Sequence, residues 1–138
     1  MKRLERQKNQ RGTSTLEMLV VLPTLLLIFF GIIEFSRALL TVNIVTTATR
    51  EGARTGVVTP TLTGDVFDPS AALTRVDQVL QSANLLTGAT RNVTCATPCV
   101  INSQVQATVQ VTFNTVVPII LPWLVNMNIT RTTTMRYE

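Results

Sequence analysis

The chain has 138 residues, of which 12 are basic and 8 acidic, so its formal net charge at pH 7 is +4. It contains no histidine, which is the commonest catalytic base and metal ligand; this excludes a hydrolase triad of the usual kind, and we expect no enzyme, no cofactor and no metal site. A nucleic-acid partner is not expected either, because seven arginines balance seven acidic residues beyond residue 12 and leave no basic stripe for a phosphate backbone.

Residues 1–12 form a short polar segment that carries the whole net charge. It contains five basic residues and one acidic residue, which are Lys2, Arg3, Glu5, Arg6, Lys8 and Arg11. Basic residues beside an apolar segment stay on the cytoplasmic side of a membrane. We therefore expect residues 1–12 to be a cytoplasmic leader, either disordered or forming the first turns of a helix, and the chain beyond residue 33 to be exported.

Residues 13–33 predict a transmembrane helix. No charged residue lies between Met18 and Ile33, and the flanking residues extend the run to the ~20 that cross a hydrocarbon core of ~30 Å. Glu17 is the exception. A carboxylate in an inserted helix costs about 2.5–3.5 kcal/mol at the bilayer centre, so it indicates a function and a partner. The partner we expect is the α-amino group that cleavage after Gly12 would create, which makes Thr13 the first residue and Glu17 the fifth.

The order of these features resembles the processing signal of type IV pilins, in which a basic leader and a glycine precede an apolar helix with glutamate at the fifth mature position. Three stretches also resemble the TadE-like minor pilins of the tight-adherence (Tad) pilus: L-P-T-L-L-L-I-F-F-G-I-I-E-F-S-R-A-L-L, A-T-R-E-G-A-R and the closing T-M-R-Y-E.

The resemblance implies a structural role. The chain would be a minor pilin or pseudopilin that helps to initiate or cap a Tad-type pilus. It would be made in a bacterial inner membrane and cleaved between Gly12 and Thr13, and it would enter the filament or its tip after assembly. Its partners would be other pilins through the N-terminal helix, a prepilin peptidase and the inner-membrane assembly platform.

Pro23 lies inside the apolar segment. Proline removes a backbone hydrogen bond and favours a kink, although neighbouring groups often compensate for this in membrane helices. It is either a flexible point that helps the helix to pack in a filament or a tolerated membrane proline. An ordinary secretory signal is disfavoured, because Glu-Phe-Ser-Arg-Ala-Leu-Leu follows Ile33 where a small-residue cleavage site would be needed.

Residues 34–56 predict a stalk helix outside the membrane, where the pattern becomes amphipathic. A helix from about Thr15 to Arg54 would have ~40 residues and span ~60 Å. Glu34 and Arg37, at i and i+3, pair either on this helix or between subunits. Arg50, Glu51 and Arg54 suggest a solvated helix end with one such pair. The small residues Ala48, Gly52 and Gly56 leave a smooth groove, which the chain's own sheet covers in the more direct interpretation and another backbone covers in the other.

Residues 57–138 predict a small head. Gly56 to Pro69 is expected to be a loop. A helix then begins with Asp68 as N-cap and Pro69 at its first position, and ends at Asn84 or Gly88. Its expected apolar face is Leu73, Val76, Leu80 and Ala83.

Alternation of apolar and polar residues predicts three strands in the same region. The clearest contains Val105, Ala107, Val109, Val111 and Phe113. Its partner is Met127 to Tyr137, with Met127, Ile129, Met135 and Tyr137 on one face, and Arg91 to Cys95 is a weaker third. The fold class is therefore α+β: a long N-terminal helix and a small antiparallel sheet with one further helix, shaped like a lollipop.

Cys95 and Cys99 are the only cysteines. Ala-Thr-Pro between them can form a turn, and the expected compartment is oxidising, so a disulfide is favoured over two reduced thiols. Closing so short a loop stabilises the chain by only ~2 kcal/mol on the loop-entropy account.

Residues 116–125, V-V-P-I-I-L-P-W-L-V, are too apolar for an ordinary exposed connection and too short to span a bilayer. Either they fold under the sheet and complete a small core, or Ile120, Leu121, Trp123 and Leu124 form an exposed contact patch for a partner pilin or the membrane surface.

The main alternative function is a single-pass anchored module for binding or adhesion that is never processed or assembled. Assembly predicts a new N-terminus at Thr13, whereas the anchored module keeps its leader. A secreted enzyme would need an activity that works without histidine.

Overall fold

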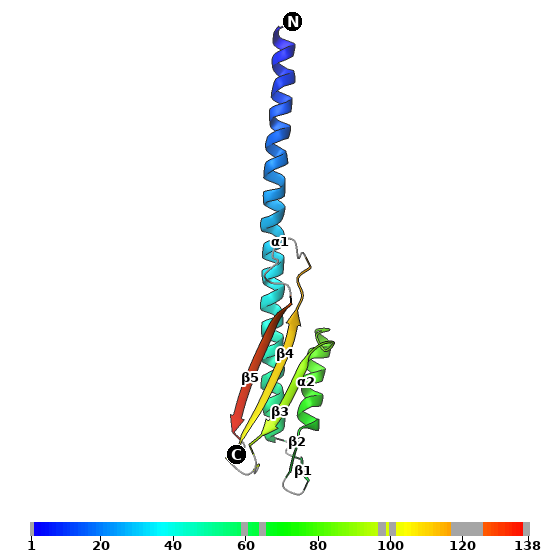
Figure 1. Ribbon diagram of the computed structural model, residues 1–138, viewed down its shortest axis with the longest axis vertical. Helices are drawn as coiled ribbons and strands as arrows, with labels where there is room; N and C mark the ends of the chain where they lie inside the picture. Colours follow the sequence, from blue (N-terminus) through cyan, green and yellow to red (C-terminus); the bar gives the residue numbers. More distant parts are fainter. Residues whose placement is uncertain are drawn as a thin grey trace.

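The computed structural model describes residues 2–58, 61–63, 66–96, 99, 102–116 and 126–136. The elements in chain order are α1 (Lys2–Val58), β1 (Thr61–Thr63), β2 (Val66–Asp68), α2 (Ser70–Ser82), β3 (Thr90–Cys95), β4 (Gln104–Phe113) and β5 (Met127–Arg136). The N-terminal half of α1 stands clear of the rest of the molecule, and the sheet and α2 lie along its C-terminal half (Figure 1). The predicted α+β class is confirmed.

Helix α1 is longer at both ends than the sequence predicted. It has 57 residues, which correspond to about 86 Å. It begins at Lys2 and continues through Gly12, Pro23 and residue 33 without a break, because lysine, arginine, glutamate, glutamine and leucine in the leader all favour a helix. At the other end it passes Arg54 and stops at Val58.

The three longer strands form an antiparallel sheet in the order β3-β4-β5. The central strand β4 alternates as predicted, with Val105, Ala107, Val109, Val111 and Phe113 buried. Strand β5 follows the prediction in part. Ile129 is buried, Met135 is half-buried and Met127 is exposed, while Tyr137 lies outside the described residues. Thr133 on the same face donates a hydrogen bond to Thr49 Oγ1 on α1 at 3.0 Å, so polar as well as apolar contacts join β5 to the stalk.

The core lies between α1, α2 and the inner face of the sheet. One cluster contains Val45, Ala48, Val76, Leu80, Val109 and Val111. A second contains Ala53, Ala72, Val93, Val105 and Ala107. Both clusters join the stalk to the head, so the stalk helix is part of the head's core.

The groove of small residues on α1 is covered by the chain itself, which confirms the first interpretation. Ala48 is buried. A Cβ atom added at Gly52 would collide with the Val76 side chain of α2, and one added at Gly56 would lie 2.9 Å from Val105 Cγ1. The sheet and α2 therefore approach α1 more closely than larger side chains would allow.

Two local predictions are wrong. The region from Gly56 to Pro69 is not only a loop, because α1 ends at Val58 and β1 and β2 pair as an antiparallel hairpin. Threonine, valine and phenylalanine favour strands, and Phe67 packs against the second core cluster.

The N-cap of α2 is Pro69 rather than Asp68. The Asp68 carboxylate still contributes, since its Oδ1 accepts the backbone N–H of Ser70 at 2.9 Å. The buried face of α2 is Ala72, Val76 and Leu80; the predicted Leu73 and Ala83 are only half-buried. The helix ends as predicted before Asn84, whose φ of 57° is the left-handed conformation common after helices.

Replacing Gly52 should test this close packing. We expect Gly52→Val to lower the free energy of unfolding by about 1–3 kcal/mol, because an overpacked core forces neighbouring side chains to move. The matched control is Gly31→Val, since nothing lies within 4 Å of a Cβ atom at Gly31. Thermal unfolding of the full chain in detergent measures both. Equal losses for the two variants would contradict the packing argument.

Candidate functional site

The N-terminal part of α1 presents apolar side chains on every side. From Leu16 to Leu40 large apolar residues are exposed at nearly every turn. The helix contains an 18-residue window with a mean hydropathy of 2.6, none of it buried. By length and composition, α1 is able to cross a membrane.

The predicted processing and assembly residues lie on this helix. Gly12 and Thr13 fall inside α1, where their side chains are outside the description. Glu17 is exposed among apolar neighbours, and Thr13, four residues earlier, shares its helix face. Pro23 is exposed, and the helix continues on both sides of it. The cleavage and the partner of Glu17 therefore remain predictions.

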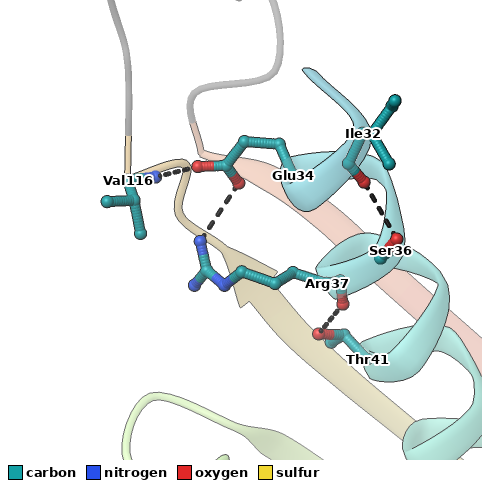
Figure 2. A network of polar contacts seen from close by, with 6 residues as sticks. All are labelled: Ile32, Glu34, Ser36, Arg37, Thr41 and Val116. Atoms are coloured by element: carbon teal, nitrogen blue, oxygen red, sulfur yellow. Dashed lines mark hydrogen bonds and ion pairs between the residues drawn. The ribbon is translucent and has the colours of Figure 1, made fainter. Parts of the chain in front are cut away.

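The second feature is the junction at which the apolar helix meets the head. Glu34 is only 5% exposed. Its Oε2 accepts a hydrogen bond from Arg37 Nη1 at 3.0 Å, and its Oε1 accepts the backbone N–H of Val116 at 2.6 Å. Figure 2 shows the carboxylate between these two donors. A buried carboxylate is tolerated when it is paired and hydrogen-bonded in this way.

The interpretation that Glu34 and Arg37 pair within one helix is confirmed. The bond to Val116, 82 residues along the chain, was not predicted, because no local pattern connects a stalk carboxylate to a residue three positions beyond the end of β4. The contact depends on where the sheet places the end of that strand.

Arg37 connects the same junction to the sheet. Its guanidinium carbon lies 5.5 Å from the centre of the Phe113 ring, the last residue of β4. This distance is within the range of cation–π attraction. One arginine therefore contacts both the Glu34 carboxylate and the end of β4.

One ion pair also connects the far end of the stalk to the head, and a second connects two elements within the head. Glu51 Oε2 lies 3.6 Å from Arg75 Nε on α2, so the predicted pairing within the end of α1 is wrong. Asp77 on α2 pairs with Arg91 on β3. Both pairs join separate elements, which a pattern of i and i+3 positions in one helix does not report.

Residues 12–54 match the model of the TadE-like protein family. The N-terminal part of the chain is TadE-like. The match covers less than half of the 138 residues and includes the apolar helix, Glu34, Arg37 and most of the stalk. No curated protein and no solved structure matches the chain.

Residues 12–54 are therefore similar to TadE-like proteins, a family that is structural rather than enzymatic. Within the described residues no group of three or more acidic, cysteine or histidine side chains is placed to hold a metal ion. What the described part of this segment presents is an exposed apolar helix surface.

The remaining predicted sites lie in the head. Cys95 and Cys99 form the expected disulfide, with 5.7 Å between their Cα atoms, which ties the last residue of β3 to a residue four positions later. The predicted contact patch of Ile120, Leu121, Trp123 and Leu124 lies outside the described residues.

The contact between Glu34 and Val116 at the junction can be tested by removing the Glu34 carboxylate. We expect Glu34→Ala to lower the free energy of unfolding by about 1–3 kcal/mol, because the Val116 N–H loses its acceptor in a partly buried position. Denaturant unfolding of the full chain in detergent measures the loss, and hydrogen exchange at Val116 should become faster.

Glu51→Ala is the matched control. Its ion pair with Arg75 joins two partly exposed side chains, and such pairs contribute less than about 1 kcal/mol. If both variants lose the same stability, the junction has no special role.

Proposed function

We propose that this chain is a minor pilin of a Tad-type type IV pilus that acts by packing, helping to initiate the filament or to cap its tip. The observation that carries the proposal is the long helix, whose apolar side chains are exposed from Leu16 to Ile33 and which continues without a break into a stalk that carries a small head. A helix of this kind exchanges lipid for neighbouring pilin helices at little cost, because both surroundings are apolar.

The chain is first inserted into a bacterial inner membrane, with its basic N-terminus in the cytoplasm and its head outside. The disulfide supports this orientation, because disulfides persist outside the reducing cytoplasm. A prepilin peptidase then removes the leader between Gly12 and Thr13. The new amino group and Glu17 neutralise each other in apolar surroundings, which offsets the cost of a membrane carboxylate. The partners are other pilins, the peptidase and the assembly platform.

An anchored module for binding or adhesion, never processed, is the alternative. The exposed helix supports it equally, since an anchor and an assembly helix have the same composition. The two functions differ at the N-terminus, which is Thr13 in the pilin and Met1 in the anchored module.

Processing is tested by changing Gly12. We expect Gly12→Leu to leave the full-length precursor in the membrane, because the peptidase needs a small residue at the cleaved bond. The control is Gly31→Leu, which changes a glycine of the same helix far from that bond and should mature normally. Mass spectrometry of membrane fractions reads out the N-terminus, and a chain that begins at Thr13 in the Gly12 variant would refute the recognition we propose.

We also propose that Ile120, Leu121, Trp123 and Leu124 form a contact patch for a partner pilin or the membrane surface, because large exposed apolar patches mark such sites. We expect Trp123→Ser to reduce the capture of partner pilins from detergent-solubilised membranes while leaving the melting temperature of the full chain almost unchanged. A loss of about 3–5 kcal/mol would instead identify a core tryptophan and end the contact hypothesis.

A further inference from the structure

We propose that the head is seated on the membrane surface through an apolar collar at its junction with the helix. The collar consists of Phe35, Leu39 and Leu40 on α1, Val116 after β4 and Met127 at the start of β5. Its partner is the lipid surface itself. The inference rests on the proposed membrane anchoring of α1 and assigns a further contact to the head.

The length of the apolar surface is the first argument. Large apolar side chains are exposed on α1 from Leu16 to Leu40, a distance of about 36 Å along the helix axis, whereas the hydrocarbon core is only ~30 Å thick. The head already contacts α1 at Glu34. The last turns of apolar surface therefore lie beside the head. Beyond Leu40 no large apolar side chain of α1 is exposed until Val58, and the exposed positions there include Asn43, Thr47 and Arg50.

The second argument is that distant parts of the chain bring apolar side chains to the same level. Val116 is 69% exposed and Met127 is 37% exposed. Val116 is hydrogen-bonded to Glu34, and Met127 pairs with Phe113 at the end of the sheet beside Arg37. Among the described residues, every exposed large apolar side chain except Val58 belongs either to the run on α1 or to this end of the head.

Charge is the third argument. Between Met18 and Leu40 the charged residues are Glu34 and Arg37. The carboxylate is buried and bonded to two donors, whereas the Arg37 side chain is 42% exposed. The level of the collar therefore presents apolar groups, one accessible cation and uncharged polar side chains such as Ser36 and Asn126. This combination fits a membrane interface, where apolar groups enter the acyl boundary and arginine reaches lipid phosphates.

The shape of the collar favours lipid over a neighbouring helix. Phe35 and Leu40 are about 140° apart around α1, and Val116 and Met127 come from the head. A helix packed alongside would cover a single stripe of the surface. A membrane surface contacts all sides of the helix at one depth.

Depth-dependent quenching of tryptophan fluorescence tests the collar. The full chain carries Trp123→Phe, which removes its only tryptophan, and then one of Leu25→Trp, Leu39→Trp or Thr47→Trp. Each variant is reconstituted in vesicles of phosphatidylethanolamine and phosphatidylglycerol whose acyl chains are brominated. Thr47 is exposed on α1 about 12 Å beyond Leu39, so it is the matched reference outside the collar. Leu25 reports insertion of the helix.

We expect strong quenching and blue-shifted emission for Leu25→Trp and Leu39→Trp, and neither for Thr47→Trp. Quenching of Leu25→Trp without quenching of Leu39→Trp would overturn the collar and leave the anchoring intact; if the emission of Leu39→Trp were still blue-shifted, the partner would be protein. Equal quenching at Leu39 and Thr47 would also overturn it, because the head would then lie deeper. An unquenched Leu25→Trp would refute the membrane anchoring itself.

Discussion

The buried carboxylate of Glu34 joins the two halves of this molecule. On one side of it α1 is an isolated apolar helix, and on the other the same helix forms one wall of a small core. A carboxylate at that position needs donors, and it finds one on its own helix at Arg37 and one on the backbone of Val116. The bond to Val116 fixes the end of β4 against the stalk. The position of the head along the helix therefore depends on this contact.

A second constraint acts further along the stalk. A head of about 80 residues can bury only a modest core of its own. The chain meets this limit by using α1 as part of the core, and the small side chains at Ala48, Gly52 and Gly56 let the sheet and α2 approach it closely. The stalk and the head are consequently one packing unit.

The TadE-like match stops at Arg54, so it covers the apolar helix and most of the stalk but none of the sheet. The proposed cleavage site, Glu17 and the exposed apolar helix are all in this part of the chain. The head has an outer sheet face of polar side chains, with Thr108 contacting Thr132 and Thr112 contacting Asn128. This division fits the proposed function, in which the N-terminal helix packs against other pilin helices. The head would then set how deeply the helix lies in the membrane and which proteins it contacts.

The sequence by itself determined the features that depend on local chemistry. Alternation along β4, the helical period of α2 and the uncharged run after Glu17 each predict one element, because strand, helix and membrane span have distinct repeats or lengths. The Cys95–Cys99 disulfide was also predictable, because the two cysteines are the only ones in the chain and three residues that can form a turn separate them. The β1–β2 hairpin was missed, because strands of three residues are too short to show alternation.

Tertiary structure alone decided the long-range contacts. Glu34 with Val116, Glu51 with Arg75 and Thr133 with Thr49 join residues whose separation in the chain carries no signal. The partners of Glu34 and Thr49 are set by where the sheet lies against α1, and that of Glu51 by the packing of α2 on the same helix. The sequence shows that Glu34 is a carboxylate at the end of an apolar run, but only the folded chain buries it and supplies its second donor.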